Sequence, residues 1–240
     1  MVSRRRAADR VRPVTITPGF IGAADGSCLI AVGRTRVVCT ATLEPGVPRW
    51  LQGKGRGWVT AEYGMLPAST GRRTRRPGPG GTSSRGTEIQ RLIGRALRAG
   101  CDLAALGPNT LIVDCDVVEA DGGTRCAAIT GGWVALALAV AKGRDDGRLP
   151  AGPHPLADQV VAVSCGIVEG TPLVDLDYAD DSRADVDANV VMTASGRLIE
   201  VQAAAEKATF SQADLGRLLR LARTGCETLA KAQARAVQLG

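Results

Sequence analysis

One short stretch, Glu119–Arg125, constrains the fold and chemistry of this chain more than any other. It reads Glu-Ala-Asp-Gly-Gly-Thr-Arg, after a β-branched segment at 110–118 and before an apolar run at 126–141. This order predicts a strand, a Gly-Gly turn and a helix. Free N–H groups and the dipole at a helix start attract anions. With the hydroxyl of Thr124 and the charge of Arg125, the turn is a candidate phosphate cradle. An ordinary strand-to-helix turn with a surface arginine is the alternative from this pattern alone.

The overall composition describes a soluble chain. Its 240 residues are 45% hydrophobic, which is enough for a core. The longest apolar run, 126–141, is interrupted by polar and glycine residues and is shorter than the roughly 20 residues of a membrane span. No signal peptide is recognisable, so we expect a cytoplasmic protein without a membrane partner.

The cysteines do not suggest a metal or redox centre. Seven are present, widely spaced and without a Cys-x-x-Cys pair, and His154 is the only histidine. A zinc site or a Cys/His nucleophile is therefore poorly supported. Buried, reduced thiols are the better interpretation.

The charges are unevenly distributed along the chain. Residues 49–98 contain eleven Lys and Arg against two acids, whereas residues 101–200 contain six against sixteen. The basic part suits a phosphate backbone, and the acidic part suits metal ions or proton transfer. Many of these charges could equally be solvated surface groups.

The basic part contains a loop and a helix. Residues 68–85 are rich in Pro and Gly and predict a mobile basic loop, which could lie over RNA or simply be a disordered surface loop. Its candidate RNA contacts are Arg72, Arg73, Arg75 and Arg76. Apolar residues at helical spacing predict an amphipathic helix over 87–99, with Arg85 just before its start.

The acidic part contains a cluster of carboxylates. Six Asp residues lie between 175 and 187, and alternation in the strand 185–194 places Asp187 and Asn189 on one face. Crowded carboxylates repel each other, which raises some pKa values unless a cation binds. The cluster could serve a metal or catalysis, or be an acidic turn beside a strand.

Several long motifs together resemble the RNase PH family of phosphate-dependent 3′-to-5′ exoribonucleases, which trim transfer RNA. The resemblance covers nearly the whole chain and is carried by five segments in order: Gly57–Pro67, Glu88–Arg95, Asp114–Arg125, Asp175–Ser182 and Asp187–Met192. It implies one domain over 1–240 with an α/β (α+β mixed sheet) fold, the sheets packed against helices as in exosome ring subunits. It also implies a hexamer built as a trimer of dimers.

The resemblance also implies a set of site residues. Phosphate would be bound by Arg85, Gly123, Thr124 and Arg125. Asp181 and Asp187 would bind a metal, Mg²⁺ or Mn²⁺, and carry out catalysis. The partners would be inorganic phosphate as co-substrate and the 3′ ends of tRNA, with release of nucleoside 5′-diphosphates.

Two other functions are compatible with the sequence. The family's usual Gln-Gly-Thr-Ala-Glu-Gly stands here as Gln-Ala-Ala-Ala-Glu-Lys at 202–207. This departure would suit a catalytically weak ring subunit that binds RNA as a scaffold. A hydrolytic nuclease is the other alternative, and it would release monophosphates without added phosphate.

Overall fold

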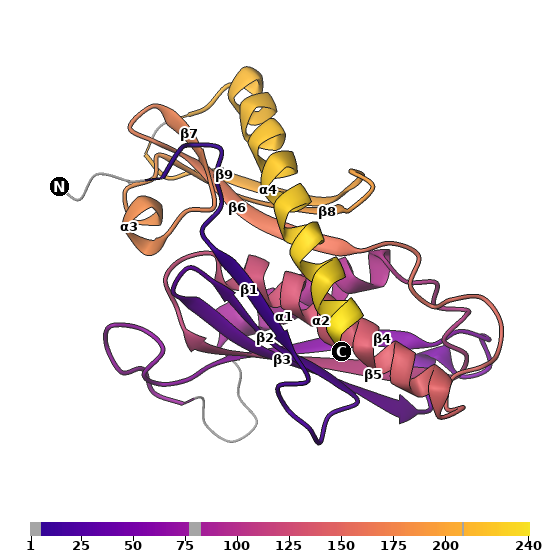
Figure 1. The fold of residues 1–240 in the computed structure, drawn as a ribbon. Coiled ribbons are helices and arrows are strands. Elements are labelled where there is room, and N and C mark those ends of the chain that lie inside the picture. The colour runs from indigo at the N-terminus through magenta and orange to yellow at the C-terminus, as the bar shows by residue number, and fades with distance from the viewer. Residues whose placement is uncertain (1–5, 77–82, 208) are drawn as a thin grey trace.

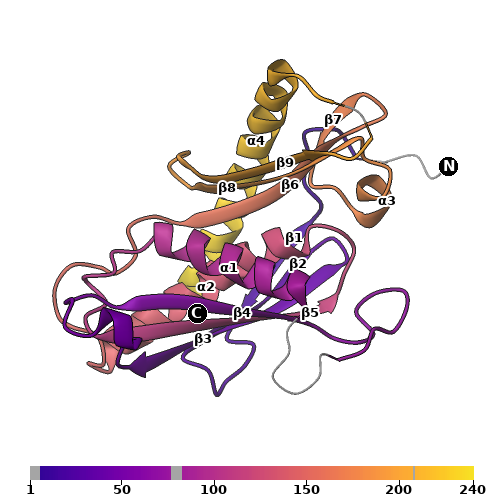
Figure 2. The same cartoon turned by 180° about the vertical axis from the view of Figure 1, so that it is seen from behind.

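The described part of the protein contains two β-sheets with two helices between them. The computed structural model describes residues 6–76, 83–207 and 209–240. In Figure 1 the first sheet lies below, helices α1 (Ser84–Ala99) and α2 (Thr124–Asp145) lie in the middle, and the second sheet lies above. Seen from behind, α1 fills the space between β4 and the second sheet (Figure 2).

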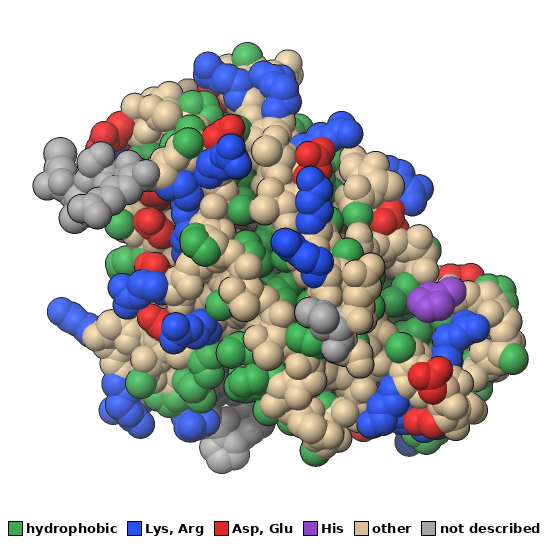
Figure 3. All heavy atoms as spheres, in the orientation of Figure 1, with side chains coloured by type: hydrophobic (Ala, Val, Ile, Leu, Met, Phe, Trp, Pro, Cys, Tyr) green, Lys and Arg blue, Asp and Glu red, His purple; other side chains and the backbone are tan. Residues whose placement is uncertain are grey.

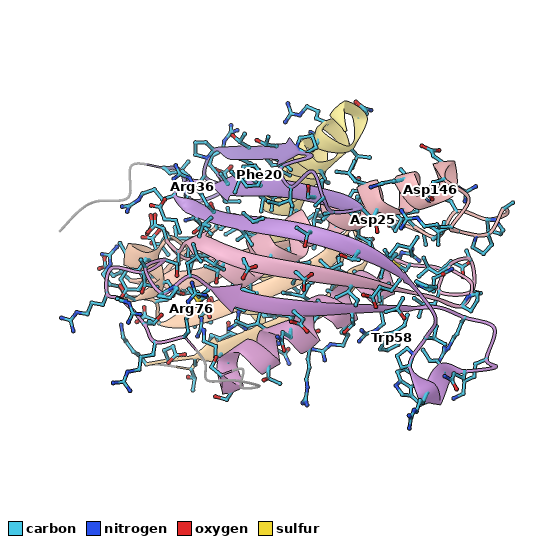
Figure 4. All side chains as sticks on the ribbon, turned by 90° about the horizontal axis from the view of Figure 1, so that it is seen from below. Phe20, Asp25, Arg36, Trp58, Arg76 and Asp146 are labelled. Atoms are coloured by element: carbon cyan, nitrogen blue, oxygen red, sulfur yellow. The ribbon has the colours of Figure 1, made fainter. Side chains whose placement is uncertain are left out.

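The first sheet has five strands in the order β1-β2-β3-β5-β4. All neighbours are antiparallel except β4 and β5, so the sheet is mixed, as predicted. The strands are β1 (Val14–Pro18), β2 (Gly26–Val32), β3 (Thr35–Pro45), β4 (Trp58–Met65) and β5 (Asn109–Glu119). A short 3₁₀ helix, η1 (Arg49–Leu51), lies before β4. Figure 4 shows the outer face of this sheet, which none of the described helices covers.

The second sheet has four antiparallel strands in the order β7-β6-β8-β9. They are β6 (Val160–Val168), β7 (Thr171–Val174), β8 (Val186–Thr193) and β9 (Leu198–Ala205). The unusual alanines at 203–205 continue β9 in register, with Ala204 opposite Asp187. The departure from the family motif therefore leaves the strand beside the acidic residues intact.

Helix α2 forms the centre of the core. By length and composition it could cross a membrane, but 83% of its most apolar window is buried inside the fold. It packs against β2, β3, β5 and β6, and its Trp133 is buried, as expected of a core residue. Its last turn extends beyond the predicted end at residue 141, because Lys142 and Arg144 favour the negative end of the helix dipole.

The C-terminal helix α4 (Gln212–Leu239) packs against both sheets. It contacts β1, β6 and β7 as well as α2. Its predicted start is confirmed: Ser211 and Asp214 form a reciprocal capping box. Figure 3 shows Lys and Arg side chains along its exposed side.

One hydrophobic cluster includes residues of both sheets and of α1, α2 and α4. The single domain over 1–240 stays a prediction, and this shared core supports it. All seven cysteines are free and six are buried, which confirms the expected reduced thiols.

The start of α1 differs from the prediction. The helix begins at Ser84, so Arg85 lies in its first turn instead of before it. Ser83 caps this end, because its Oγ accepts a hydrogen bond from the Gly86 N–H at 3.0 Å. The Pro- and Gly-rich residues before Ser83 hid this cap in the sequence.

Candidate active site

The Gly-Gly turn before α2 has the geometry that the sequence suggested. Gly122 and Gly123 have φ values of 79° and 70°, in the left-handed region that favours glycine. A Cβ on Gly122 would also lie 2.6 Å from the Leu176 carbonyl oxygen. Gly123 is the N-cap of α2 and supplies no side-chain hydrogen bond. Within the described residues, the first N–H groups of α2 thus have no side-chain acceptor at the cap, which suits an anion.

A buried ion pair holds this turn in place. Arg12 binds Asp175 with three hydrogen bonds of 2.7–2.9 Å, from its backbone N–H and two side-chain nitrogens. The same guanidinium donates to the carbonyl oxygens of Asp121 and Gly122. Arg12 and Asp175 are only 6% and 4% exposed. Burial would lower the pKa of Arg12, but Asp175 outweighs it and raises the pKa, so the arginine stays charged.

Two contacts fix the residues that follow the turn. The Tyr63 hydroxyl of β4 donates to Thr124 Oγ1 at 3.0 Å, which leaves the Thr124 proton free to donate to an anion. Arg125 Nη1 lies 3.1 Å from Glu88 Oε1 of α1 and 3.1 Å from Gln202 Oε1 of β9. Arg125 therefore connects the first turn of α2 to α1 and to the second sheet.

The two candidate catalytic carboxylates come from neighbouring elements. Asp181 ends the short helix α3 (Tyr178–Asp181), and Asp187 lies on β8. Burial raises the pKa of Asp187, and the negative charges of Asp181 and Glu206 raise it further, against the effect of Arg125. Burial also raises the pKa of Asp181, while Arg85 and Arg125 oppose the rise.

The structure places the predicted residues within electrostatic range of one another. The positive charges of Arg85 and Arg125 both oppose the rise in the pKa of Asp181, and Arg125 opposes that of Asp187 as well. Residues from α1, α2, α3 and β8 thus share one cluster of opposite charges beside the free N-terminus of α2. Such a cluster can hold an anion next to groups that exchange protons.

The basic loop lies at the same end of the molecule. Ser69 accepts a hydrogen bond from the Ala120 N–H, directly before the turn, at 2.8 Å. Figure 4 shows Arg76 at the end of the first sheet where Arg36 lies, and Arg36 pairs with Glu119. The side chains of Arg72, Arg73, Arg75 and Arg76 are exposed. The prediction of a mobile loop over 68–85 also includes residues 77–82, which lie outside the described residues.

Asp181 and Asp187 could supply only some of the ligands that a divalent cation such as Mg²⁺ requires. Among the described residues, no group of three or more His, Cys, Asp or Glu side chains could hold a metal ion. Mg²⁺ commonly uses one or two carboxylates together with water and substrate phosphate. Asp181 and Asp187 offer two such oxygen donors, so they fit this mode and not an all-protein cage.

Four residues around the site were not identified as site residues from the sequence: Arg12, Tyr63, Glu88 and Gln202. Tyr63 and Glu88 belong to segments that carry the family resemblance, and Gln202 begins the altered one, so a signal existed for them. Arg12 gave none, because it lies among other arginines and its partner is 163 residues away.

Comparison with known proteins identifies the family of these motifs. The models of domain 1 and domain 2 of the 3′ exoribonuclease family match residues 10–142 and 158–225. The chain is 54% identical over 233 residues to the ribonuclease PH of Neisseria meningitidis FAM18, covering 97% of this chain and 96% of that protein. It is 53% identical over 234 residues to the ribonuclease PH of Methylobacterium radiotolerans, covering 97% and 98%.

Solved structures agree on the fold. Rice Rrp46 superposes with a TM-score of 0.79 at 20% identity, covering 98% of this chain and 99% of that one. A chain of the Archaeoglobus fulgidus exosome with RNA bound to its active site gives 0.77 at 23% identity, covering 94% and 90%. The α/β class and the fold expected from exosome ring subunits are thereby confirmed.

The first prediction concerns the ion pair under the turn. Arg12→Ala should lower the free energy of unfolding by about 3 kcal/mol, because the buried Asp175 carboxylate loses both hydrogen bonds from the Arg12 guanidinium. The backbone N–H of residue 12 and the longer contact with Arg6, at 3.5 Å, compensate only in part. Urea denaturation measures this change. The exposed Arg10→Ala variant is the control, and it should change stability by less than about 0.5 kcal/mol. Equal midpoints for the two variants would show that the pair does not stabilise the fold.

The second prediction follows from the raised pKa of Asp187. A carboxyl whose folded-state pKa exceeds its unfolded value destabilises the protein above that pKa, and this effect disappears as the pH falls towards the unfolded value. Asp187→Asn should therefore raise the melting temperature at pH 7 in buffer with EDTA and without phosphate. The gain should vanish on acidification. Asp9→Asn, which removes an exposed carboxylate, should show no such trend, and a pH-independent gain in Asp187→Asn would contradict the account.

Proposed function

Because the chain belongs to the 3′ exoribonuclease family and is a phosphorolytic 3′-to-5′ exoribonuclease, we propose that the cluster around Arg125 is its active site. The observation that carries this proposal is that the positive charges of Arg85 and Arg125 both lower the pKa of one carboxyl group, Asp181, against the effect of its burial. This cluster adjoins the N-terminus of α2, which has no side-chain cap among the described residues. In the reaction, an oxygen of inorganic phosphate attacks the last phosphodiester of RNA. The bond to the 3′ oxygen breaks, and a nucleoside 5′-diphosphate leaves.

The first task of the site is to bring two anions together. Arg85, Arg125, the Thr124 hydroxyl and the N–H groups after Gly123 would bind phosphate and offset its repulsion from the RNA backbone. The neutral peptide groups add no competing negative charge. Because the links formed and broken are of similar energy, the reaction also runs backwards as a nucleotidyl transfer.

The second task is to protonate the departing 3′ oxygen. Asp187 is our candidate general acid, because burial and Asp181 raise its pKa towards the range in which it can carry a proton. Asp181 and Asp187 would also hold Mg²⁺ or Mn²⁺, which supplies positive charge to the scissile phosphate when it is bound.

The third task is to guide the RNA. We propose that Arg72, Arg73, Arg75 and Arg76 contact the backbone of a tRNA 3′ end near the Gly-Gly turn. Their exposure and their position at the same end of the sheet support this role. We further propose a cytoplasmic enzyme that assembles as a hexamer, a trimer of dimers; a solved archaeal relative is described as an exosome core.

The scaffold alternative has less support. Its main argument is the altered 203–207 segment, yet β9 stays paired with β8 through Ala205. The candidate groups Arg85, Thr124, Arg125, Asp181 and Asp187 are also all present. A hydrolytic nuclease differs in its product and its need for phosphate, so one assay separates it from the proposed reaction.

The third prediction is the test of this function. With a 3′-labelled RNA, the protein should release nucleoside 5′-diphosphates only when phosphate is added. Arg125→Ala should lower this activity by about 10²-fold or more, since it removes charge from the phosphate site. Asp187→Asn should abolish turnover but retain RNA binding. Monophosphates in the absence of phosphate would contradict phosphorolysis, and normal rates in either variant would remove that residue from the mechanism.

The fourth prediction concerns the basic loop. Changing Arg72, Arg73, Arg75 and Arg76 together to Gln should weaken RNA binding and flatten the plot of log K against log salt, by up to about 0.7 per lost phosphate contact for single-stranded RNA. Binding is measured by fluorescence anisotropy between 50 and 300 mM salt. The control for net charge removes the same number of charges from α4, by changing its exposed Arg217, Arg220, Arg223 and Arg235 to Gln. A slope equal to that of the control would refute contact between this loop and RNA.

A further inference from the structure

The guanidinium of Arg125 is held along one edge. Its Nη1 donates to Glu88 and to Gln202, each at 3.1 Å. Within the described residues, its Nε and Nη2 donate no hydrogen bond to another group. The Arg125 side chain is 18% exposed and that of Glu88 is 48% exposed, so the contact lies at the rim of the site. One edge of the rigid fork is thus fixed, and the Nε–Nη2 edge stays available.

A second ion pair determines the orientation of Gln202. Arg95 of α1 binds Glu200 with two hydrogen bonds of 2.7 Å, from Nε and Nη2. Gln202 Nε2 donates to the same carboxylate at 2.9 Å. A carboxylate only accepts, so the amide nitrogen must face Glu200 and the amide oxygen must face Arg125. Arg95 and Glu200 thereby turn an acceptor towards Nη1 of Arg125.

The two acceptors of Arg125 differ in charge, since Gln202 is a neutral amide and Glu88 is a carboxylate. Gln202 accepts without carrying a charge, so it holds Arg125 and does not compete with an anion. Glu88 lies three residues after Arg85 on α1. The same helix therefore supplies one phosphate-binding arginine and the carboxylate that orients the other.

We propose that Glu88 and Gln202 are positioning residues, which fix Arg125 through Nη1 and present its Nε–Nη2 edge to inorganic phosphate. The inference rests on the proposed phosphate site and adds the groups that orient it. An arginine that is held before binding loses less rotamer freedom when phosphate arrives, so the two acceptors act on phosphate affinity. They do not touch the reacting atoms.

The test is a separation of KM from kcat. Phosphorolysis rates are measured against phosphate at saturating RNA, and against RNA at saturating phosphate. Glu88→Ala and Gln202→Met should each raise the KM for phosphate about tenfold, as expected for the loss of one hydrogen bond to a charged group. The kcat and the KM for RNA should stay within about twofold. Glu88→Gln keeps an acceptor oxygen and should show a smaller rise.

The control is Glu227→Gln, which removes the carboxylate of an exposed Arg–Glu contact on α4 and should change none of these constants. An unchanged KM for phosphate in Glu88→Ala and Gln202→Met would overturn the inference. A lower KM in Glu88→Ala would also overturn it, because Glu88 would then be a competitor of phosphate. Arg125→Ala distinguishes failure of the proposed phosphate site from failure of the positioning role. A normal KM for phosphate in Arg125→Ala would show that Arg125 does not bind phosphate. A large rise in Arg125→Ala, without one in Glu88→Ala and Gln202→Met, would contradict only the positioning role of Glu88 and Gln202.

Discussion

The buried ion pair between Arg12 and Asp175 is the interaction on which the site depends. It joins the residues before β1 to the loop before α3, and its guanidinium also binds two carbonyl oxygens of the turn before α2. Removing two charges from water is costly, and only dense hydrogen bonding offsets the cost. Arg12 has this dense hydrogen bonding, with three bonds to Asp175 and two to carbonyl oxygens of the turn. Its contribution is therefore best understood as fixing one arrangement of three segments that are distant in the sequence.

That arrangement decides what the site can do. The Arg12 guanidinium binds the carbonyl oxygens of Asp121 and Gly122, and the Gly-Gly turn then leads into α2. Among the described residues, the first N–H groups of α2 have no side-chain cap. The loop held by Asp175 continues into α3 and brings Asp181 within electrostatic range of Asp187, whose pKa the charge of Asp181 raises. A region that favours anions and a pair of carboxylates thus adjoin. Arg85 and Arg125 reduce the repulsion between phosphate and the carboxylates, because their positive charges attract both.

The sequence predicted the local parts of this site and missed the tertiary ones. The strand, the Gly-Gly turn and helix α2 follow from periodicity and from glycine's access to positive φ, so β5 and α2 could be predicted. The start of α1 could not, since its cap lies among Pro- and Gly-rich residues that resemble a loop. No pattern connects Arg12 with Asp175, and none shows that Gln202 reaches Arg125. These contacts arise only when the two sheets pack around α1 and α2.

The central claim is that phosphate binds between Arg125 and the N-terminus of α2, beside the carboxylate pair. A crystal structure of the protein with inorganic phosphate and a short RNA tests it most directly. The account predicts phosphate oxygens within hydrogen-bond distance of Arg85, Arg125 and Thr124, with the terminal phosphodiester between them and Asp187. Phosphate bound elsewhere, or an RNA 3′ end that lies away from Asp181 and Asp187, would contradict it.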